Sequence, residues 1–328
     1  SNLRHRPVGL GLMGFQDSLY IQNMAYATEE AIQFADETME AVSYYTINAS
    51  SDLAEERGSY ATFEGSLWSQ GILPIDSIEK LKTERGADYI EMDESQTQDW
   101  DYIREKVRTQ GMRNSNVMAI APTATISNIA GSFQSIEPTY RNLFVKSNLS
   151  GDFTIVNEYL IQDLKDRDLW DDQMLDDLKH YDGGVQHIDR VPADLKELYK
   201  TAFEVDPFAM IECTSRRQKW IDMGISFNLY IDTPSGKMLN DMYMACWKKG
   251  LKTTYYLRSL AATRIEKSTT SSNGNTSARP PKTRVANDTE LAPVTPTVND
   301  PSIDKLLDGK QAAGNACSID NPDCEACQ

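Results

Sequence analysis

The chain has 328 residues, of which 40% are hydrophobic, so it is long enough to bury one sizeable core. Its formal net charge of −16 argues against nucleic-acid polymers, whose phosphates need clustered Lys and Arg, although a local loop can still bind a nucleotide. The chain has neither a secretory signal nor the run of roughly 20 apolar residues that crosses a membrane, and its five cysteines are an odd number. We therefore expect a cytoplasmic protein in a reducing compartment.

The first predicted element is a strand over residues 7–15 that ends in a glycine-rich turn. Helices are predicted over 16–23 and over 28–57. Thr28 is the expected N-cap of the long helix and Gly58 its expected end.

The chain starts with Ser1, without an initiator Met, almost directly before a strand of core character. We therefore expect a piece of a longer protein. It would be a processed product, one half of a split gene, or a product of protein splicing with Ser1 as its first residue.

The middle of the chain continues this alternation. Residues 71–74 are predicted to form a loop, 100–110 a helix and 115–121 a short strand that runs into a loop at 122–127.

Further helices are predicted over 153–178, 192–203 and 237–249, and strands over 226–231 and 253–257. Strands that alternate with helices indicate an α/β architecture with largely parallel pairing.

The composition changes after about Lys267. No aromatic residue follows Tyr256, and six of the 13 prolines fall from Pro280 onward. Such a segment buries too little apolar surface to offset its ordering entropy, so we expect a disordered tether over 267–328. A flexible chain of about 60 residues spans roughly 40 Å.

Gly9, Gly11 and Gly14 match the GxGxxG pattern of dinucleotide-binding loops. That fingerprint needs a second strand ending in an acidic residue about 20 residues later. Here the distance leads to Asp36 and Glu37, inside a predicted helix. Glycines that pack a strand closely against a helix are the favoured interpretation.

The loop at 122–127 leads into a helix start. Its hydroxyls and free amides would form a neutral cradle for a phosphate. No Gly-Lys-Thr follows, so the segment is not a P-loop, and taken alone an ordinary N-cap is favoured. The candidate residues are Pro122, Thr123, Ala124, Thr125, Ile126 and Ser127.

Tyr255 and Tyr256 stand in a segment of strand character. Because neighbouring strand residues usually point to opposite faces, a stacked pair requires a local distortion. Each hydroxyl needs a partner if buried, and the other tyrosine can provide one. Core aromatic residues are the default interpretation.

The chain ends with Cys324 and Cys327, separated by two residues. Such a pair can form a disulfide and exchange it with another dithiol. Only Cys317 lies nearby and no histidine does, so a zinc site is not expected. Cys213 and Cys246 lie in helical or apolar contexts, and we expect them to be buried and inert.

Several motifs occur in order along the chain and precede this cysteine pair. They are the strand over 8–15, Gly71-Ile72-Leu73-Pro74-Ile75-Asp76, Met112-Arg113-Asn114-Ser115, Ala121-Pro122-Thr123-Ala124-Thr125 with Ile136-Glu137-Pro138, Arg217-Gln218-Lys219-Trp220-Ile221-Asp222 and Lys252-Thr253-Thr254-Tyr255-Tyr256-Leu257-Arg258. In order and spacing, they resemble the C-terminal region of the large subunit of class I (aerobic) ribonucleotide reductases.

The resemblance implies the second half of a ten-stranded α/β barrel over 1–266, followed by the flexible tether over 267–328. The enzyme would reduce ribonucleoside diphosphates to 2′-deoxyribonucleoside diphosphates by a radical mechanism, for DNA precursor synthesis.

The same resemblance implies roles for the candidate residues. The 122–127 loop would bind the substrate diphosphate. Tyr255 and Tyr256 would relay a radical from a metal-containing small subunit, which would dock near 237–253. Cys324 and Cys327 would reduce the active-site disulfide and then be reduced by thioredoxin or glutaredoxin.

Other parts of such an enzyme would lie upstream of Ser1. These are the thiyl-forming and reducing cysteines, their Asn and Glu partners, and the sites for ATP and deoxynucleotide effectors. The chain alone is therefore expected to be inactive without an N-terminal partner, and to bind no metal or cofactor itself.

Two other classes of function are kept open. A nicotinamide-dependent oxidoreductase would use Gly9, Gly11 and Gly14. A non-catalytic scaffold would recruit partners through its acidic surface and its tail.

Overall fold

Four extended segments lie side by side in a computed structural model that describes residues 1–148 and 151–260. The chain divides into two units, Ser1–Ser268 and Thr269–Gln328, and every described residue belongs to the first. All three pairings between neighbouring segments are parallel. They join Leu10 to Met118, Ile120 to Ile225, and β3 (Leu229–Ile231) to β4 (Leu257–Ser259).

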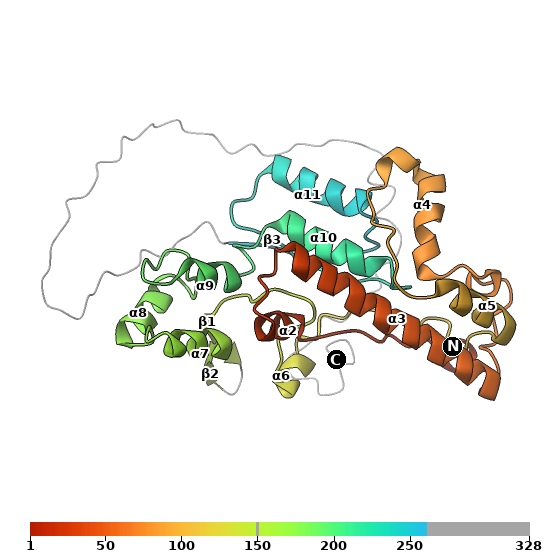
Figure 1. The fold of residues 1–328 in the computed structure, drawn as a ribbon, viewed down its shortest axis with the longest axis horizontal. Helices are drawn as coiled ribbons and strands as arrows, with labels where there is room; N and C mark the ends of the chain where they lie inside the picture. Colours follow the sequence, from red (N-terminus) through yellow and green to blue (C-terminus); the bar gives the residue numbers. More distant parts are fainter. Residues whose placement is uncertain (149–150, 261–328) are drawn as a thin grey trace, which may run out of the picture. The chain divides into compact units, whose positions relative to one another are not determined.

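Helices connect these segments in the chain. α3 (Glu29–Arg57) and α5 (Trp100–Gln110) come between the first two segments, and α10 (Pro207–Gln218) comes between the second and third. α11 (Gly236–Lys248) joins β3 to β4, and α10 lies between α3 and α11 (Figure 1). The predicted α/β fold is therefore confirmed.

The other elements are short and include an antiparallel hairpin of two strands. They are α1 (Asn2–His5), α2 (Phe15–Ile21), η1 (Trp68–Gln70), η2 (Pro74–Asp76), α4 (Ser77–Arg85), η3 (Ala87–Tyr89), α6 (Ile126–Ala130), β1 (Leu143–Asn148), β2 (Gly151–Val156), α7 (Glu158–Asp166), α8 (Asp172–His180) and α9 (Ala193–Leu198).

The long helix α3 has the predicted ends. The Thr28 side chain accepts a hydrogen bond from the amide of Ala31 at 3.3 Å, which satisfies one of the free first-turn donors. At the other end, Gly58 adopts φ +79°, a conformation that glycine reaches without strain. Both ends of the helix depend on residues close in sequence, which explains why they could be predicted.

The predicted helix over 153–178 is wrong. Residues up to Val156 form β2, and α7 and α8 follow as two separate helices. Phe153, Thr154, Ile155 and Val156 are aromatic or β-branched and suit a strand, and β1 provides the hydrogen-bonding partner. Similarly, the helix predicted over 192–203 is only Ala193–Leu198 long.

Helix α10 was not predicted from the sequence. Asp206 accepts a hydrogen bond from the amide of Phe208, and Pro207 is the first helical residue, a common helix start. The predicted strand over 7–15 pairs regularly only around Leu10, since α2 already begins at Phe15.

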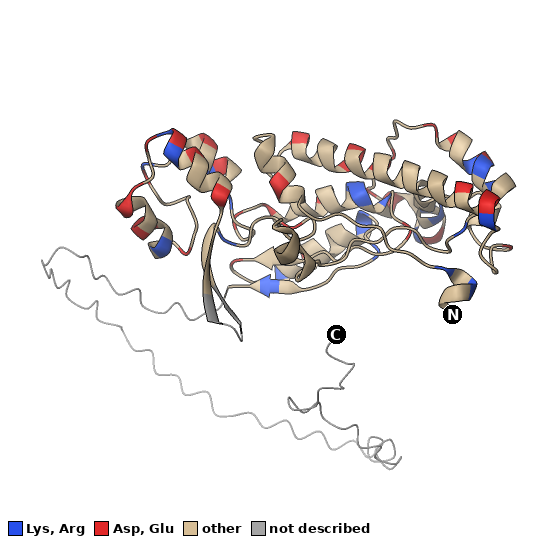
Figure 2. Ribbon diagram, turned by 90° about the horizontal axis from the view of Figure 1, so that it is seen from below, with Lys and Arg blue, Asp and Glu red and all other residues tan. Residues whose placement is uncertain are grey.

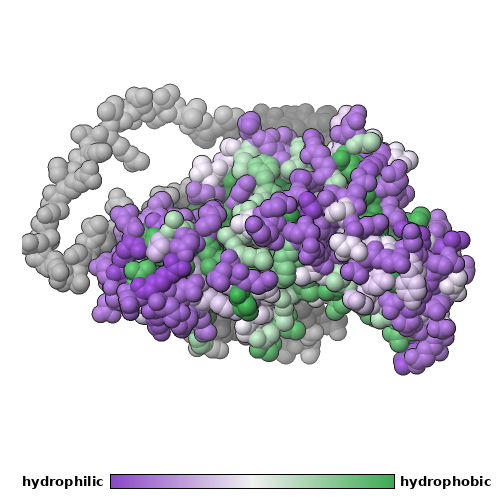
Figure 3. Space-filling model, in the orientation of Figure 1, coloured by the Kyte–Doolittle hydropathy of each residue, from purple (hydrophilic) through white to green (hydrophobic). Residues whose placement is uncertain are grey.

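The described residues form two hydrophobic clusters. The larger one packs α3, α5, α10 and α11 around the parallel segments, and the smaller one joins α7, α8 and α9 to α2 through Tyr20. The side of α7–α9 seen in Figure 3 is mainly hydrophilic.

Asp and Glu are spread over most of the helices rather than gathered in one cluster (Figure 2). Within residues 1–148 and 151–260, no helix combines the length and the apolar character needed to cross a membrane.

Candidate functional site

The loop at 122–127 follows the second parallel segment and leads into α6. Thr123 adopts φ +53°, and its hydroxyl accepts a hydrogen bond from the amide of Ser135 at 2.8 Å. The carbonyl of Thr123 accepts from the amide of Ser127 at 3.0 Å. These bonds fold residues 122–135 back on themselves, so that hydroxyls from both ends of the segment gather in one place.

Three of these hydroxyls have no hydrogen-bond partner among the described residues. They belong to Ser127, Ser132 and Ser135. Ser127 and Ser135 are fully buried. Buried polar groups are normally paired, so a cluster of unpaired hydroxyls indicates a place where a polar ligand would be stabilised. Ser127 was a predicted site residue, whereas Ser132 and Ser135 were not.

Tyr255 and Tyr256 lie just before β4, with 46% and 52% of their surfaces exposed. Their hydroxyl oxygens are 3.1 Å apart, and Tyr255 donates the hydrogen bond. Their ring centroids are 4.0 Å apart at an angle of 46°. Regular pairing of β4 begins only at Leu257, so the distortion that a stacked pair requires is present. The core interpretation is wrong for this pair.

The main chain on both sides of this pair is bonded to the neighbouring strand. The amide of Tyr255 donates to the carbonyl of Phe227 at 2.7 Å, and the carbonyl of Tyr256 accepts from the amide of Leu229 at 2.8 Å. The hydrogen bond to Tyr256 raises the pKa of the Tyr255 phenol above its ordinary value. The backbone is thus fixed while both phenols face outward.

A buried carboxyl group, from the loop between α6 and β1, contacts the residue that precedes β3. Glu137 Oε1 accepts a hydrogen bond from the amide of Asn228 at 3.2 Å. Burial raises the pKa of Glu137 to about 7, and bonds from Asn228 and Tyr230 offset this only in part. Glu137 was predicted only as part of a family motif and not as a site residue. Its position between Ile136 and Pro138 is a signal for burial that was available.

The glycine pattern has a structural explanation. A Cβ on Gly11 would lie 2.3 Å from the carbonyl oxygen of Ala119, so glycine allows close approach to the neighbouring strand. Gly14 is the N-cap of α2 with φ +77°. Asp36, where the ribose-binding acid would be, is buried in α3 beside Lys219. Close packing is confirmed, with a strand rather than a helix as the partner.

Cys213 and Cys246 are buried and free, as predicted, and burial raises the pKa of each thiol to about 11. Cys317, Cys324 and Cys327 lie outside the described residues. Within the described ranges, no group of three or more His, Cys, Asp and Glu side chains could hold a metal ion.

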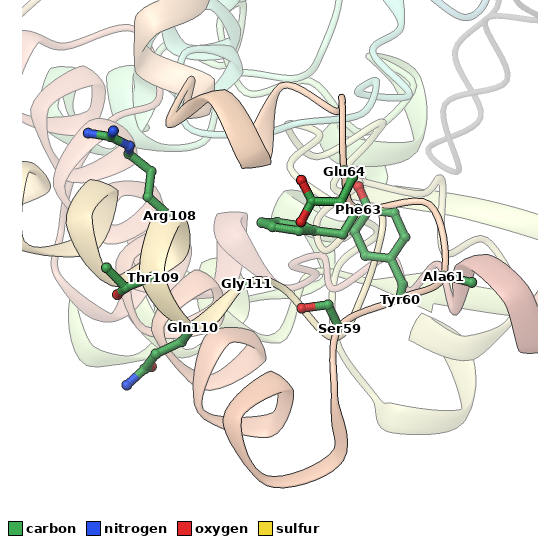
Figure 4. Close-up of a pocket in the computed structure, with 9 residues that line it drawn as sticks. All are labelled: Ser59, Tyr60, Ala61, Phe63, Glu64, Arg108, Thr109, Gln110 and Gly111. Atoms are coloured by element: carbon green, nitrogen blue, oxygen red, sulfur yellow. The ribbon is translucent and has the colours of Figure 1, made fainter.

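A hollow of about 240 Å³ lies between the end of α5 and residues 59–64. Figure 4 shows the guanidinium of Arg108 turned away from Glu64. The hollow contains no predicted site residue, and we assign no role to it.

Residues 1–257 match the family described as ribonucleotide reductase, barrel domain. The chain belongs to this family. The match includes both tyrosines and the segment 122–135 with Ser127, Ser132 and Ser135, which we call the serine loop. It ends before residues 267–328. The alternative of a nicotinamide-dependent oxidoreductase has no support from these comparisons or from the glycine geometry.

Several relatives are ribonucleotide reductase subunits. The chain is 61% identical to the ribonucleoside-diphosphate reductase subunit alpha of Chlamydia pneumoniae, over 82% of this chain and 26% of the relative. It is 35% identical to the ribonucleoside-diphosphate reductase large chain of Schizosaccharomyces pombe, over 100% of this chain and 39% of the relative. The chain thus spans only a quarter to two fifths of these relatives.

A solved structure supports the same family. The class Id ribonucleotide reductase alpha subunit of Actinobacillus ureae superposes with a TM-score of 0.60 and 25% sequence identity, over 79% of this chain and 40% of that one. The tyrosine pair and the serine loop are therefore parts of a reductase barrel domain.

Proposed function

We propose that this chain is the C-terminal portion of the large subunit of a class I ribonucleotide reductase. Together with its upstream portion, it would convert a ribonucleoside diphosphate and two thiols into a 2′-deoxyribonucleoside diphosphate, a disulfide and water, for DNA precursor synthesis. The observation that carries the proposal is the exposed tyrosine pair, whose phenol oxygens lie 3.1 Å apart.

This distance suits transfer of a hydrogen atom. An oxidant on a metal-containing small subunit would first oxidise Tyr256 to its phenoxyl radical. Tyr255, which donates the hydrogen bond, would then lose its O–H hydrogen to Tyr256. One O–H bond breaks and one forms, so an electron and a proton move together. The resulting Tyr255 radical would oxidise the upstream thiol that attacks the substrate.

The serine loop would bind the substrate diphosphate. The predicted residues 122–127 provide the loop, and the unpaired hydroxyls of Ser127, Ser132 and Ser135 are donors that phosphate oxygens would satisfy. The segment before the loop is the second of the parallel strands, and ligands in α/β folds bind at the carboxyl ends of such strands.

The remaining parts of the proposal concern partners. The small subunit would dock near 237–253, where Tyr243, Met244 and Trp247 of α11 are exposed. Exposed apolar side chains on α11 support an interface there. ATP and deoxynucleotide effectors would bind to upstream regions.

The four parallel segments would form part of the second half of a ten-stranded barrel. Val8 and Leu10 are about half exposed, and within the described residues their segment pairs with only one neighbour. The N-terminal half of the large subunit would cover this edge.

The terminal cysteines would supply electrons. In each turnover the thiols of Cys324 and Cys327 would reduce the active-site disulfide and become a disulfide themselves, which a dithiol of thioredoxin or glutaredoxin would then reduce. This chemistry requires a reducing cytoplasm, in agreement with the two free cysteines in the core.

The test is reduction of a ribonucleoside diphosphate by this chain mixed with its N-terminal portion, the small subunit and a thioredoxin system. We expect turnover, and Tyr256→Phe should abolish it because phenylalanine has no O–H bond to exchange. Tyr102→Phe, which alters an equally exposed tyrosine on α5, should retain it. Full activity of Tyr256→Phe in a folded enzyme would refute the relay.

A further inference from the structure

The carboxyl group of Glu137 is connected to the tyrosine pair by two hydrogen bonds. Its Oε1 accepts from the main-chain amide of Asn228 at 3.2 Å. The side-chain oxygen of Asn228 accepts from the main-chain amide of Tyr256 at 3.1 Å. Glu137 and Asn228 are both 8% exposed, so these bonds are protected from water.

The segment around Glu137 is also fixed on its other side. The hydroxyl of Tyr26 donates to the carbonyl of Ile136 at 2.7 Å, and the amide of Ser135 donates to the hydroxyl of Thr123 in the serine loop. Glu137 therefore lies between the serine loop and the strand that carries the tyrosine pair. A movement of either segment would displace Glu137.

The second carboxyl oxygen, Oε2, has no partner in hydrogen-bond geometry among the described residues. A satisfied structural carboxylate would have bonds to both oxygens, as Glu40 has in α3. Burial raises the pKa of Glu137, and the hydroxyl of Tyr230 offsets this in part without meeting hydrogen-bond geometry to Oε2, so Glu137 is less fully paired than Glu40.

Three groups interact electrostatically with Glu137. Two are the buried phenols of Tyr26 and Tyr230, and the third is the positively charged guanidinium of Arg258 in β4, which attracts the carboxylate. The guanidinium of Arg258 also lies over the ring of Tyr256, 5.5 Å from its centroid. Arg258 thus contacts the tyrosine pair and responds to the charge on Glu137.

We propose that Glu137 is a positioning residue for radical transfer: it holds Asn228, and through it the main chain of Tyr256, and its carboxylate keeps Arg258 over the Tyr256 ring. This inference rests on the proposed function. Burial raises the pKa of Glu137 to about 7, so the carboxyl gains and loses its charge near neutral pH. Arg258 is attracted only when Glu137 is ionised, and the environment of Tyr256 changes with it.

The test uses the large subunit completed by its upstream portion, with 3-fluorotyrosine at position 256. The ¹⁹F chemical shift is followed from about pH 5.5 to pH 8.5. We expect a step near pH 7 from Glu137. Glu137→Gln keeps an oxygen for Asn228 but cannot ionise, so it should remove this step.

Two further variants complete the design. Glu40→Gln alters another buried glutamate, distant in α3, and should keep the step. Arg258→Gln removes the exposed cation that favours ionised Glu137, so it should move the step to higher pH. Because Arg258 is at the surface, this variant tests the proposal even if Glu137→Gln does not fold.

Activity provides the second readout. In the assembled enzyme, Glu137→Gln should lower kcat about tenfold with little change in KM, and should flatten the pH dependence of kcat near pH 7. The proposal is overturned if wild type shows no step, if the step persists in Glu137→Gln, or if Arg258→Gln leaves it in place. The NMR spectra need no turnover, so they can refute the role of Glu137 without refuting the proposed reductase function, and the reverse also holds.

Discussion

Two buried polar regions of this molecule are built in opposite ways. The side chain of Lys219 is 1% exposed, and its ammonium group contacts Asp36 at 2.9 Å, Asp93 at 2.5 Å and the carbonyl of Ser95 at 2.9 Å. Around the serine loop and Glu137, four buried oxygens lack a partner among the described residues. The first region pairs its buried charges fully, whereas the second leaves polar atoms free.

The paired region around Lys219 is the kind that stabilises a fold, whereas unpaired buried groups are typical of binding and reaction sites. The Lys219 cluster joins α3, α10 and the segment at 93–95, and Asp36 also accepts from the indole of Trp220 at 2.6 Å. Paired buried groups of this kind hold elements together. Unpaired ones cost stability, and proteins keep that cost where a ligand or a reaction uses the group.

Lys219→Met should produce the largest loss of stability. It would remove the buried cation between Asp36 and Asp93 and leave them only their ion pairs with Arg216, at 3.2 and 3.3 Å. Removing one partner of a buried ion pair costs about 3–5 kcal/mol, and Arg216 sets that range as the upper limit here. Chemical denaturation of the chain measures this free energy of unfolding. Lys237→Met, at an 89% exposed site, should change it by less than about 0.5 kcal/mol. Equal stability of both variants would remove the structural role of the cluster.

The two regions should also respond to pH with opposite signs. Burial raises the pKa of Asp93, but bonds from Lys219 and Ser95 outweigh it and lower the pKa to about 2. Its stabilisation is present above the unfolded pKa of about 3.9 and is lost as the pH falls toward 2.

Glu137 has a raised pKa instead, so stability should fall as the pH rises from about 4.5 to about 7, by at most about 1.4 kcal/mol per pH unit. Unfolding measured across both windows should show the two slopes. Glu137→Gln should remove only the upper one, and an unchanged upper slope would assign it to another group.

Ser127→Ala should have the smallest effect on stability, because its hydroxyl has no partner to lose. We expect the KM for the diphosphate substrate to rise about tenfold, or about 1.4 kcal/mol. Ser43→Ala is the matched control, since Ser43 is buried and donates to the carbonyl of Trp220 at 2.6 Å. It should destabilise the chain and leave KM unchanged, and the reverse pattern would contradict the assignment of the loop.

Sequence reasoning succeeded where the signal was local. The caps Thr28 and Gly58 and the helix over 100–110 depend on residues within a few positions of one another, and all were predicted. It failed where the partner was distant. The exposure of the tyrosine pair depends on how β4 joins β3, and Glu137 meets Asn228 across 91 positions of sequence.

The loop is an intermediate case. Its residues were identified, but an ordinary N-cap was favoured because the pairing of each hydroxyl was not visible in the sequence. The helix over 153–178 was wrong because its true partner, β1, was not predicted as a strand.

The half-exposed phenols have a consequence for the lifetime of any radical on them. An oxidised ring at an open surface can be quenched by small reductants in solution or can couple with another ring, and either reaction would destroy the enzyme's oxidant without product. Excluding solvent from reactive intermediates is a general requirement of catalysis. If Tyr255 and Tyr256 carry the radical as proposed, the surface that covers them would have to protect the radical as well as deliver it.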